Sequence, residues 1–148
     1  MLLSLTKFVA SEDSGSALIE IALVAPVIMF ILLGVIEVGR FSNYNVLVAS
    51  AAKSGVQYGS RTVVNSIDAL GIKSAAVTDS NLANLVVTSS SFCQCADGSA
   101  SLCLPTDCGS THFNQHLTVT ASYPFKPVFN VGVGTTIITK SVTMTVRP

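Results

Sequence analysis

The sequence predicts an α+β protein: a long N-terminal helix, then a small antiparallel β-sheet domain with a cysteine-rich loop. The helix is indicated by residues 21–36, which carry no charge and are almost all apolar. The sheet is indicated by residues 116–124 and 136–147, where apolar and polar side chains alternate as they do in a half-buried strand. The loop is indicated by the cysteines, all of which fall within residues 93–108.

The helical pattern extends from Ser16 to about Tyr58, and residues 17–41 form its membrane-length part. At about 1.5 Å of rise per residue, Ser16 to Glu37 would cover roughly the 30 Å hydrocarbon thickness of a bilayer. Pro26 lies inside the pattern, so we expect a kink or the loss of one backbone hydrogen bond there. Membrane helices tolerate such a proline better than soluble ones do.

Charged residues flank the apolar run. Glu20 lies near its start, and the pair Glu37 and Arg40 closes its other end. An ionised carboxylate at the centre of a bilayer costs about 2.5 to 3.5 kcal/mol, so Glu20 needs a partner or a place among the lipid headgroups. The residues alone favour the headgroup interpretation.

After Phe41 the helix becomes amphipathic, and small residues recur four apart at Ala51, Gly55 and Gly59. This spacing permits the close approach of another backbone. Packing on the chain's own domain and packing against another subunit both remain open.

Beyond residue 60 the chain is rich in Ser, Thr, Val and Asn, which suits strands and polar turns. We expect a short helix over residues 75–84 and a first strand over 85–92. The alternating segments 116–124 and 136–147 then add two strands, joined by a connection that contains Pro127.

The cysteines have the spacing C-x-C-x₇-C-x₄-C. A bridge between Cys93 and Cys95 would close a very small ring. This leaves Cys93–Cys103 with Cys95–Cys108, or Cys93–Cys108 with Cys95–Cys103. A zinc site aided by His112 and His116 is the competing interpretation, but zinc sites usually have C-x₂₋₄-C pairs. The two histidines precede or enter a strand, so we expect no helical spacing between them and no metal.

Composition excludes several functions. Net charge is zero, only 11% of residues are charged, and no basic block exists, so nucleic-acid binding has no support. No G-x-S-x-G, H-E-x-x-H or phosphate-binding glycine loop is present. We therefore expect no enzyme, no cofactor and no small-molecule substrate.

The run GSALIEIALVAPVIMFILLGVIEVGR, residues 15–40, resembles the TadE-like family of the tight-adherence (Tad) pilus system. That family shares a G-x-A-x-x-E-x-A-L-x-x-P opening and a G-x-x-E-x-G-R close. Residues 119–129 and the final SVTMTVR are also similar to it. The matching positions of the opening and close are Gly15, Ala17, Glu20, Ala22, Leu23, Pro26, Gly34, Glu37, Gly39 and Arg40.

The resemblance implies a prepilin-type leader, residues 1–15, cut between Gly15 and Ser16 by a membrane-embedded prepilin peptidase. The helix, residues 16–60, and the extracytoplasmic α+β domain, residues 61–148, would form the mature protein. Its implied partners are the membrane, the peptidase, other pilins and Tad assembly proteins, in a bacterial inner membrane or an extracellular pilus. Adhesion and biofilm formation would be the outcome.

Within that resemblance Glu20 acquires a role. Its carboxylate would neutralise the Ser16 amine of a neighbouring subunit and set the axial register. Major pilins of these systems commonly carry a tyrosine after the glutamate. Here Ile21 stands in that place, which favours a minor pilin or pseudopilin. An uncleaved membrane-anchored assembly factor is the alternative, and a membrane-tethered metal-binding or enzymatic domain is one of another class.

The positive-inside rule disagrees with the extracytoplasmic placement of the C-terminal domain that the resemblance implies. It counts Lys7 before the apolar run against Arg40, Lys53 and Arg61 after it, which favours a cytoplasmic C-terminal domain. The cysteine loop and the resemblance favour the outside. We expect a single pass with the C-terminal domain outside the cytoplasm.

Overall fold

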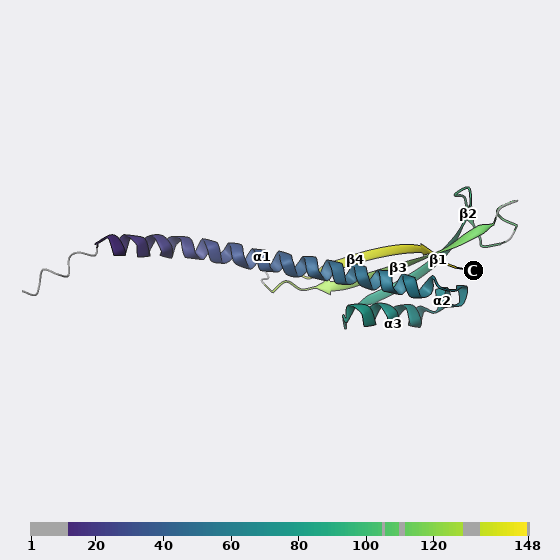
Figure 1. Cartoon of the computed structure of the whole chain (residues 1–148), viewed down its shortest axis with the longest axis horizontal. Helices are drawn as coiled ribbons and strands as arrows, with labels where there is room; N and C mark the ends of the chain where they lie inside the picture. Colours follow the sequence, from purple (N-terminus) through teal and green to yellow (C-terminus); the bar gives the residue numbers. More distant parts are fainter. Residues whose placement is uncertain (1–11, 105, 110–111, 129–133, 148) are drawn as a thin grey trace, which may run out of the picture. The chain divides into compact units, whose positions relative to one another are not determined.

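A computed structural model describes residues 12–104, 106–109, 112–128 and 134–147. It confirms the predicted α+β fold, with a long helix followed by a four-stranded sheet (Figure 1). The first eleven residues of the expected leader lie outside the described part. The elements, in chain order, are α1 (Glu12–Gly59), α2 (Val63–Ile67), α3 (Ala69–Ser80), β1 (Val86–Cys95), β2 (Ala100–Ser101), β3 (Phe113–Phe125) and β4 (Thr136–Thr145).

The chain divides into two compact units, residues 1–39 and 40–148. Helix α1 contributes to both, because the second unit begins within it at Arg40. The helix is continuous through Pro26. Proline has no N–H group, so the carbonyl of Ala22 loses its usual donor four residues later.

In the second unit the sheet is antiparallel throughout, with strand order β2-β1-β3-β4. The pairing of β3 with β4 puts residues of one kind opposite each other: Val119 pairs with Val142, and Thr120 pairs with Ser141. The alternation predicted from the sequence therefore gives the sheet one apolar and one hydroxyl-bearing face.

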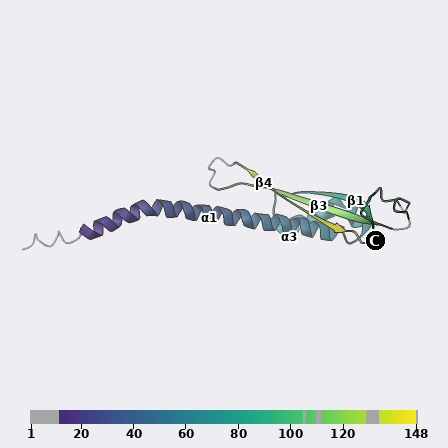
Figure 2. The same ribbon diagram turned by 90° about the horizontal axis from the view of Figure 1, so that it is seen from above.

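Helices α1 and α3 cover the apolar face, and the strands form a separate layer (Figure 2). The core between the layers is almost fully shielded from solvent. It is built from small and branched side chains, which lets the helices lie close to the sheet. Its members with at most 1% exposure are Val48, Ala51, Ala52, Val56, Ile72, Ala76, Leu117, Val119 and Ala121.

The opposite face of the sheet is lined with hydroxyl groups that bond across strands β3 and β4. Each pair is directly opposed in the register, so the side chains meet without distortion. The pairs are Thr118–Thr143 and Thr120–Ser141, both with oxygens 2.8 Å apart, and Ser122–Thr139 at 3.0 Å.

The helix expected over residues 75–84 is wrong in its bounds, since α3 runs from Ala69 to Ser80. Asp68 caps its start by accepting a hydrogen bond from the Gly71 N–H at 3.0 Å. That bond, followed by the one from the Tyr58 hydroxyl, lowers the pKa of Asp68. Asn81 ends the helix in the left-handed conformation, with φ 52°.

Three further elements differ from the expectation. Helix α2 was not predicted, and neither was the two-residue strand β2 inside the cysteine loop. Strand β1 continues past Phe92 to Cys95, so two cysteines belong to the sheet rather than to the loop.

Candidate assembly surface and membrane segment

In the first unit α1 presents apolar side chains on all sides. Leu23 is 72% exposed and Phe30 is 74% exposed, and the large apolar side chains between them are 48% to 65% exposed. A helix that is apolar all round is stable only when something apolar surrounds it, such as lipid or other helices. This surface has the character of a membrane segment or an assembly surface.

Glu20 lies on this surface and is exposed. It borders a shallow hollow whose other walls are apolar: Ile21, Val24, Ala25 and Ile28. The backbone of Gly15 and Ser16, the expected cleavage site, lies within α1. The amine proposed as the partner of Glu20 would exist only after cleavage and would belong to another subunit. The pairing therefore stays a prediction.

At the start of the second unit, aromatic side chains from α1 and β3 meet. Tyr44 stacks on Tyr123 with ring centroids 5.1 Å apart and planes at 9°. Phe125 makes T-shaped contacts with Tyr44 and Phe41, with ring centroids 5.4 Å apart in both pairs. The guanidinium carbon of Arg40 lies 5.6 Å from the centre of the Phe125 ring, a cation–π geometry. Burial and the neighbouring Tyr44 raise the pKa of Tyr123.

Of the predicted helix-end pair, Arg40 lies in the second unit, where it makes this contact with Phe125. Glu37 is half-buried and belongs to the first unit. Sequence reasoning missed the aromatic group altogether. Its signal was the recurrence of Phe41 and Tyr44 within one helical turn. A second signal was the Tyr-Pro-Phe sequence at the end of the 116–124 alternation.

The structure pairs Cys93 with Cys103 and Cys95 with Cys108, one of the two arrangements that spacing left open. Among the described residues no cysteine is free, so none offers a thiolate to a metal. Asp107 organises the loop between the bridges by accepting hydrogen bonds from the Leu102 N–H at 2.7 Å and the Ser101 hydroxyl at 3.1 Å. His112 precedes β3 and His116 lies within it, where it stacks on Phe92.

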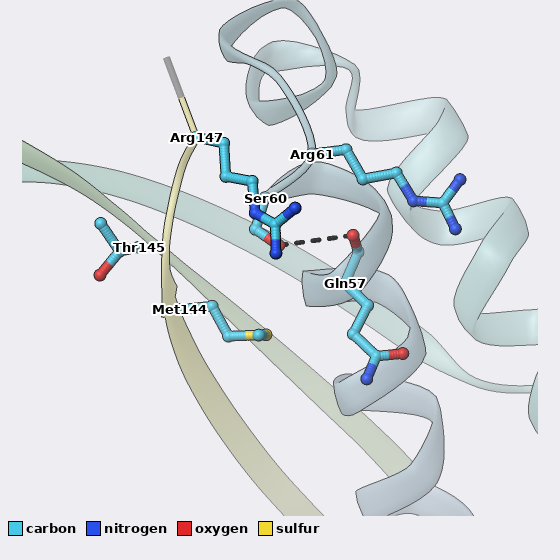
Figure 3. Close-up of a pocket in the computed structure, with 6 residues that line it drawn as sticks. All are labelled: Gln57, Ser60, Arg61, Met144, Thr145 and Arg147. Atoms are coloured by element: carbon cyan, nitrogen blue, oxygen red, sulfur yellow. Dashed lines mark hydrogen bonds between the residues drawn. The ribbon is translucent and has the colours of Figure 1, made fainter.

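A hollow at the end of α1 is shown in Figure 3. The Ser60 hydroxyl donates a hydrogen bond to the main-chain carbonyl of Gln57 at 3.4 Å. The main-chain carbonyl of Ser60 accepts a hydrogen bond from the main-chain N–H of Arg147 at 2.9 Å. The Arg147 side chain lies beside Ser60, whereas Arg61 extends away from it. Gln57, Met144 and Thr145 complete the lining, which contains no carboxylate, histidine or cysteine among the described residues. The side chains of Arg61 and Arg147 do not converge on one point, and the described lining offers no set of groups that resembles a catalytic site. The hydrogen bond between Arg147 and Ser60 instead links the C-terminal segment to the end of α1.

By length and composition, one helix in the part of the chain that the structure describes, residues 17–59 of α1, is able to cross a membrane. Together with the all-round apolar surface and the paired cysteines, it fits one class of protein: a single-pass membrane-anchored protein with a disulfide-bonded α+β unit. The model of the family described as TadE-like protein matches residues 15–57. This confirms the resemblance for α1, and the similarity at residues 119–129 lies outside the match.

No curated protein and no solved structure matches the chain. The family match indicates a membrane protein associated with a Tad pilus system.

Proposed function

We propose that the chain is a minor pilin or pseudopilin that takes part in Tad (Flp-type) pilus biogenesis, adhesion and biofilm formation. The observation that carries the proposal is the coincidence of two ranges. The family match begins at Gly15, the last residue of the expected leader. It then covers the part of α1 whose apolar surface has no covering in the described part of the chain. Such a surface can be covered by lipid before assembly and by other helices after it.

In this proposal a prepilin peptidase cuts between Gly15 and Ser16, and the mature protein enters the complex through α1. The new Ser16 amine is largely cationic at neutral pH. Glu20 of an adjacent subunit neutralises it within an apolar environment, where an unpaired charge is unfavourable and a paired one specifies the register. The apolar walls around Glu20 support this role.

The proposed location is the bacterial inner membrane, crossed once, with residues 61–148 outside the cytoplasm and in part within the extracellular pilus. The two disulfides support the outside placement, because such bonds persist in oxidising compartments and are rare in the cytosol. The peptidase, other pilins and Tad assembly proteins are the proposed partners.

The decisive experiment determines the N-terminus of the mature protein. Mass spectrometry of the chain recovered from assembled complexes should find Ser16 as the first residue, and a bulky substitution such as Gly15→Leu should leave the leader attached. Recovery of intact residues 1–15 in the final complex would overturn the pilin proposal. The chain would then be an uncleaved membrane-anchored assembly factor.

A further inference from the structure

Aromatic and basic side chains gather where α1 enters the second unit and β3 ends. We name this group the aromatic–basic cluster and define it as Arg40, Tyr44, Tyr123, Phe125 and Lys126. Three of its members are rings joined through Tyr44, which stacks on Tyr123 at 5.1 Å and meets Phe125 at 5.4 Å between ring centroids. Phe125 is buried, whereas the two tyrosines are half-buried. A half-buried tyrosine combines an apolar ring that packs in a core with a hydroxyl group that can form hydrogen bonds.

Two cations belong to the cluster. Arg40 stacks on the Phe125 ring, and Lys126 follows that ring in the chain and is exposed. All five members line one hollow of about 310 Å³, together with Asn84 and Pro124. The described lining of this hollow contains the two cations Arg40 and Lys126 and no acidic residue.

The position of the cluster along the chain is equally informative. Arg40 comes four residues after the uncharged stretch 21–36, with Glu37 between them, and Tyr44 comes one helical turn after Arg40 on the same continuous helix. If α1 crosses a bilayer, residues 40–44 lie at the level of the headgroups, since each residue advances the helix by only about 1.5 Å. Tyrosine is enriched at this level in membrane proteins, and nearby Lys and Arg are attracted to anionic lipids.

We propose that the aromatic–basic cluster binds the headgroups of anionic phospholipids. It thereby holds the sheet of the second unit against the membrane surface. Arg40 and Lys126 contact the phosphates, and the phenols of Tyr44 and Tyr123 donate hydrogen bonds at the same level. The inference depends on the membrane span and is independent of leader cleavage and of pilus entry. Its failure is thus distinguishable from failure of the pilin proposal.

The chain contains its own reporters for a test. It has three tyrosines and no tryptophan, and two of the tyrosines belong to the cluster. The full-length Tyr58→Phe variant is reconstituted in nanodiscs of phosphatidylcholine alone or mixed with phosphatidylglycerol, each with a small share of headgroup-nitroxide lipid of the same class. Quenching of tyrosine emission reports contact with the labelled headgroups. We expect several-fold stronger quenching by labelled phosphatidylglycerol than by labelled phosphatidylcholine.

Two double variants separate the cluster from general electrostatics. Arg40→Gln with Lys126→Gln should abolish the preference for phosphatidylglycerol. Lys53→Gln with Arg61→Gln removes the same charge from exposed positions of the same unit and should retain it. Lys126→Gln alone, at an exposed site, should weaken the preference.

Three results would overturn the proposal. Equal quenching by the two labelled lipids shows that the cluster does not select anionic headgroups. Equal loss in both double variants shows that total charge, rather than the cluster, attracts the lipid. Quenching that falls as more copies share one disc shows that a second copy of the chain covers the cluster instead.

Discussion

At the scale of single residues, the closest contacts of the second unit depend on glycine. A Cβ added at Gly55 would lie 3.2 Å from Val119 Cγ1, and one added at Gly59 would collide with the Leu117 side chain. The small residues Ala51, Gly55 and Gly59 thus allow α1 to pack closely on the sheet of the same chain. Of the two alternatives that the sequence left open, the structure shows packing on the chain's own domain. No second subunit is needed to explain it.

Gly59→Ala should therefore destabilise the second unit. The new methyl group meets Leu117 and also approaches Ile72 Cδ1 to 3.1 Å, and overpacking of this kind costs about 1 to 3 kcal/mol. Thermal or urea unfolding of the detergent-solubilised protein, followed by near-ultraviolet circular dichroism, measures the change. Gly34→Ala is the matched control, since an added Cβ there meets nothing within 4 Å. Equal stability of the two variants would show that the sheet moves away from α1 without strain.

Glu20 supports a second prediction at this scale. Glu20→Ala should leave the helix and its membrane insertion intact, because it removes a charge from an apolar, exposed surface. Co-assembly with pilin partners, measured by co-purification from membranes, should nevertheless fall strongly. Glu37→Gln is the control at the other end of the apolar run, and it should co-purify normally. Unimpaired co-assembly of Glu20→Ala would remove the register role.

At the scale of elements, predictability followed the length and regularity of the pattern. Residues 116–124 and 136–147 alternate over eight residues or more, so their strands, β3 and β4, were predicted closely. Helix α2 has only five residues and no period to detect. Helix α3 was placed too late because its start depends on a single capping side chain, Asp68, whose partner N–H is visible only in the fold.

The cysteine pairing shows a different limit. Both arrangements of Cys93, Cys95, Cys103 and Cys108 close loops of similar length, so entropy does not choose between them. The choice follows from the register, since Cys93 and Ser101 are paired residues of β1 and β2. Cys103 is thereby brought close to Cys93, with Cα atoms 5.2 Å apart. The sequence could not reveal this register, because β2 has only two residues.

Removing the Cys95–Cys108 bridge should open the loop without unfolding the sheet. Strand β2 pairs with β1 at only two positions, whereas β1 pairs with β3 along its whole length. A bridge that closes about 15 residues contributes about 3 kcal/mol in the chain-entropy description. In the Cys95→Ser, Cys108→Ser double variant, hydrogen exchange should accelerate at residues 99–104. Amides of β3 and β4 should keep their protection, and their simultaneous loss would show that the bridge stabilises the whole unit.

At the scale of the whole molecule, one helix takes part in two different environments. Residues 40–59 of α1 are amphipathic and bury one face on the sheet, whereas residues 21–36 are apolar on all sides. The boundary between them falls where the charged pair Glu37 and Arg40 ends the apolar run, and it coincides with the division into two units. A helix that changes from apolar on all sides to amphipathic is typical of a membrane anchor that continues into a folded domain and forms part of its core.

Orientation is the property of the whole chain on which charge counting and the cysteines disagree. If the second unit is outside the cytoplasm, its cysteines are oxidised in cells, because the cytosol keeps thiols reduced. Spheroplasts treated with a membrane-impermeant maleimide should give no labelling before reduction, and four labels after an impermeant reductant reaches the two bridges. The Cys95→Ser, Cys108→Ser variant should give two labels under the same treatment. Cysteines that are already reduced, and labelled only after lysis, would place the sheet in the cytoplasm. That result would make the count of Lys7 against Arg40, Lys53 and Arg61 the better guide to topology.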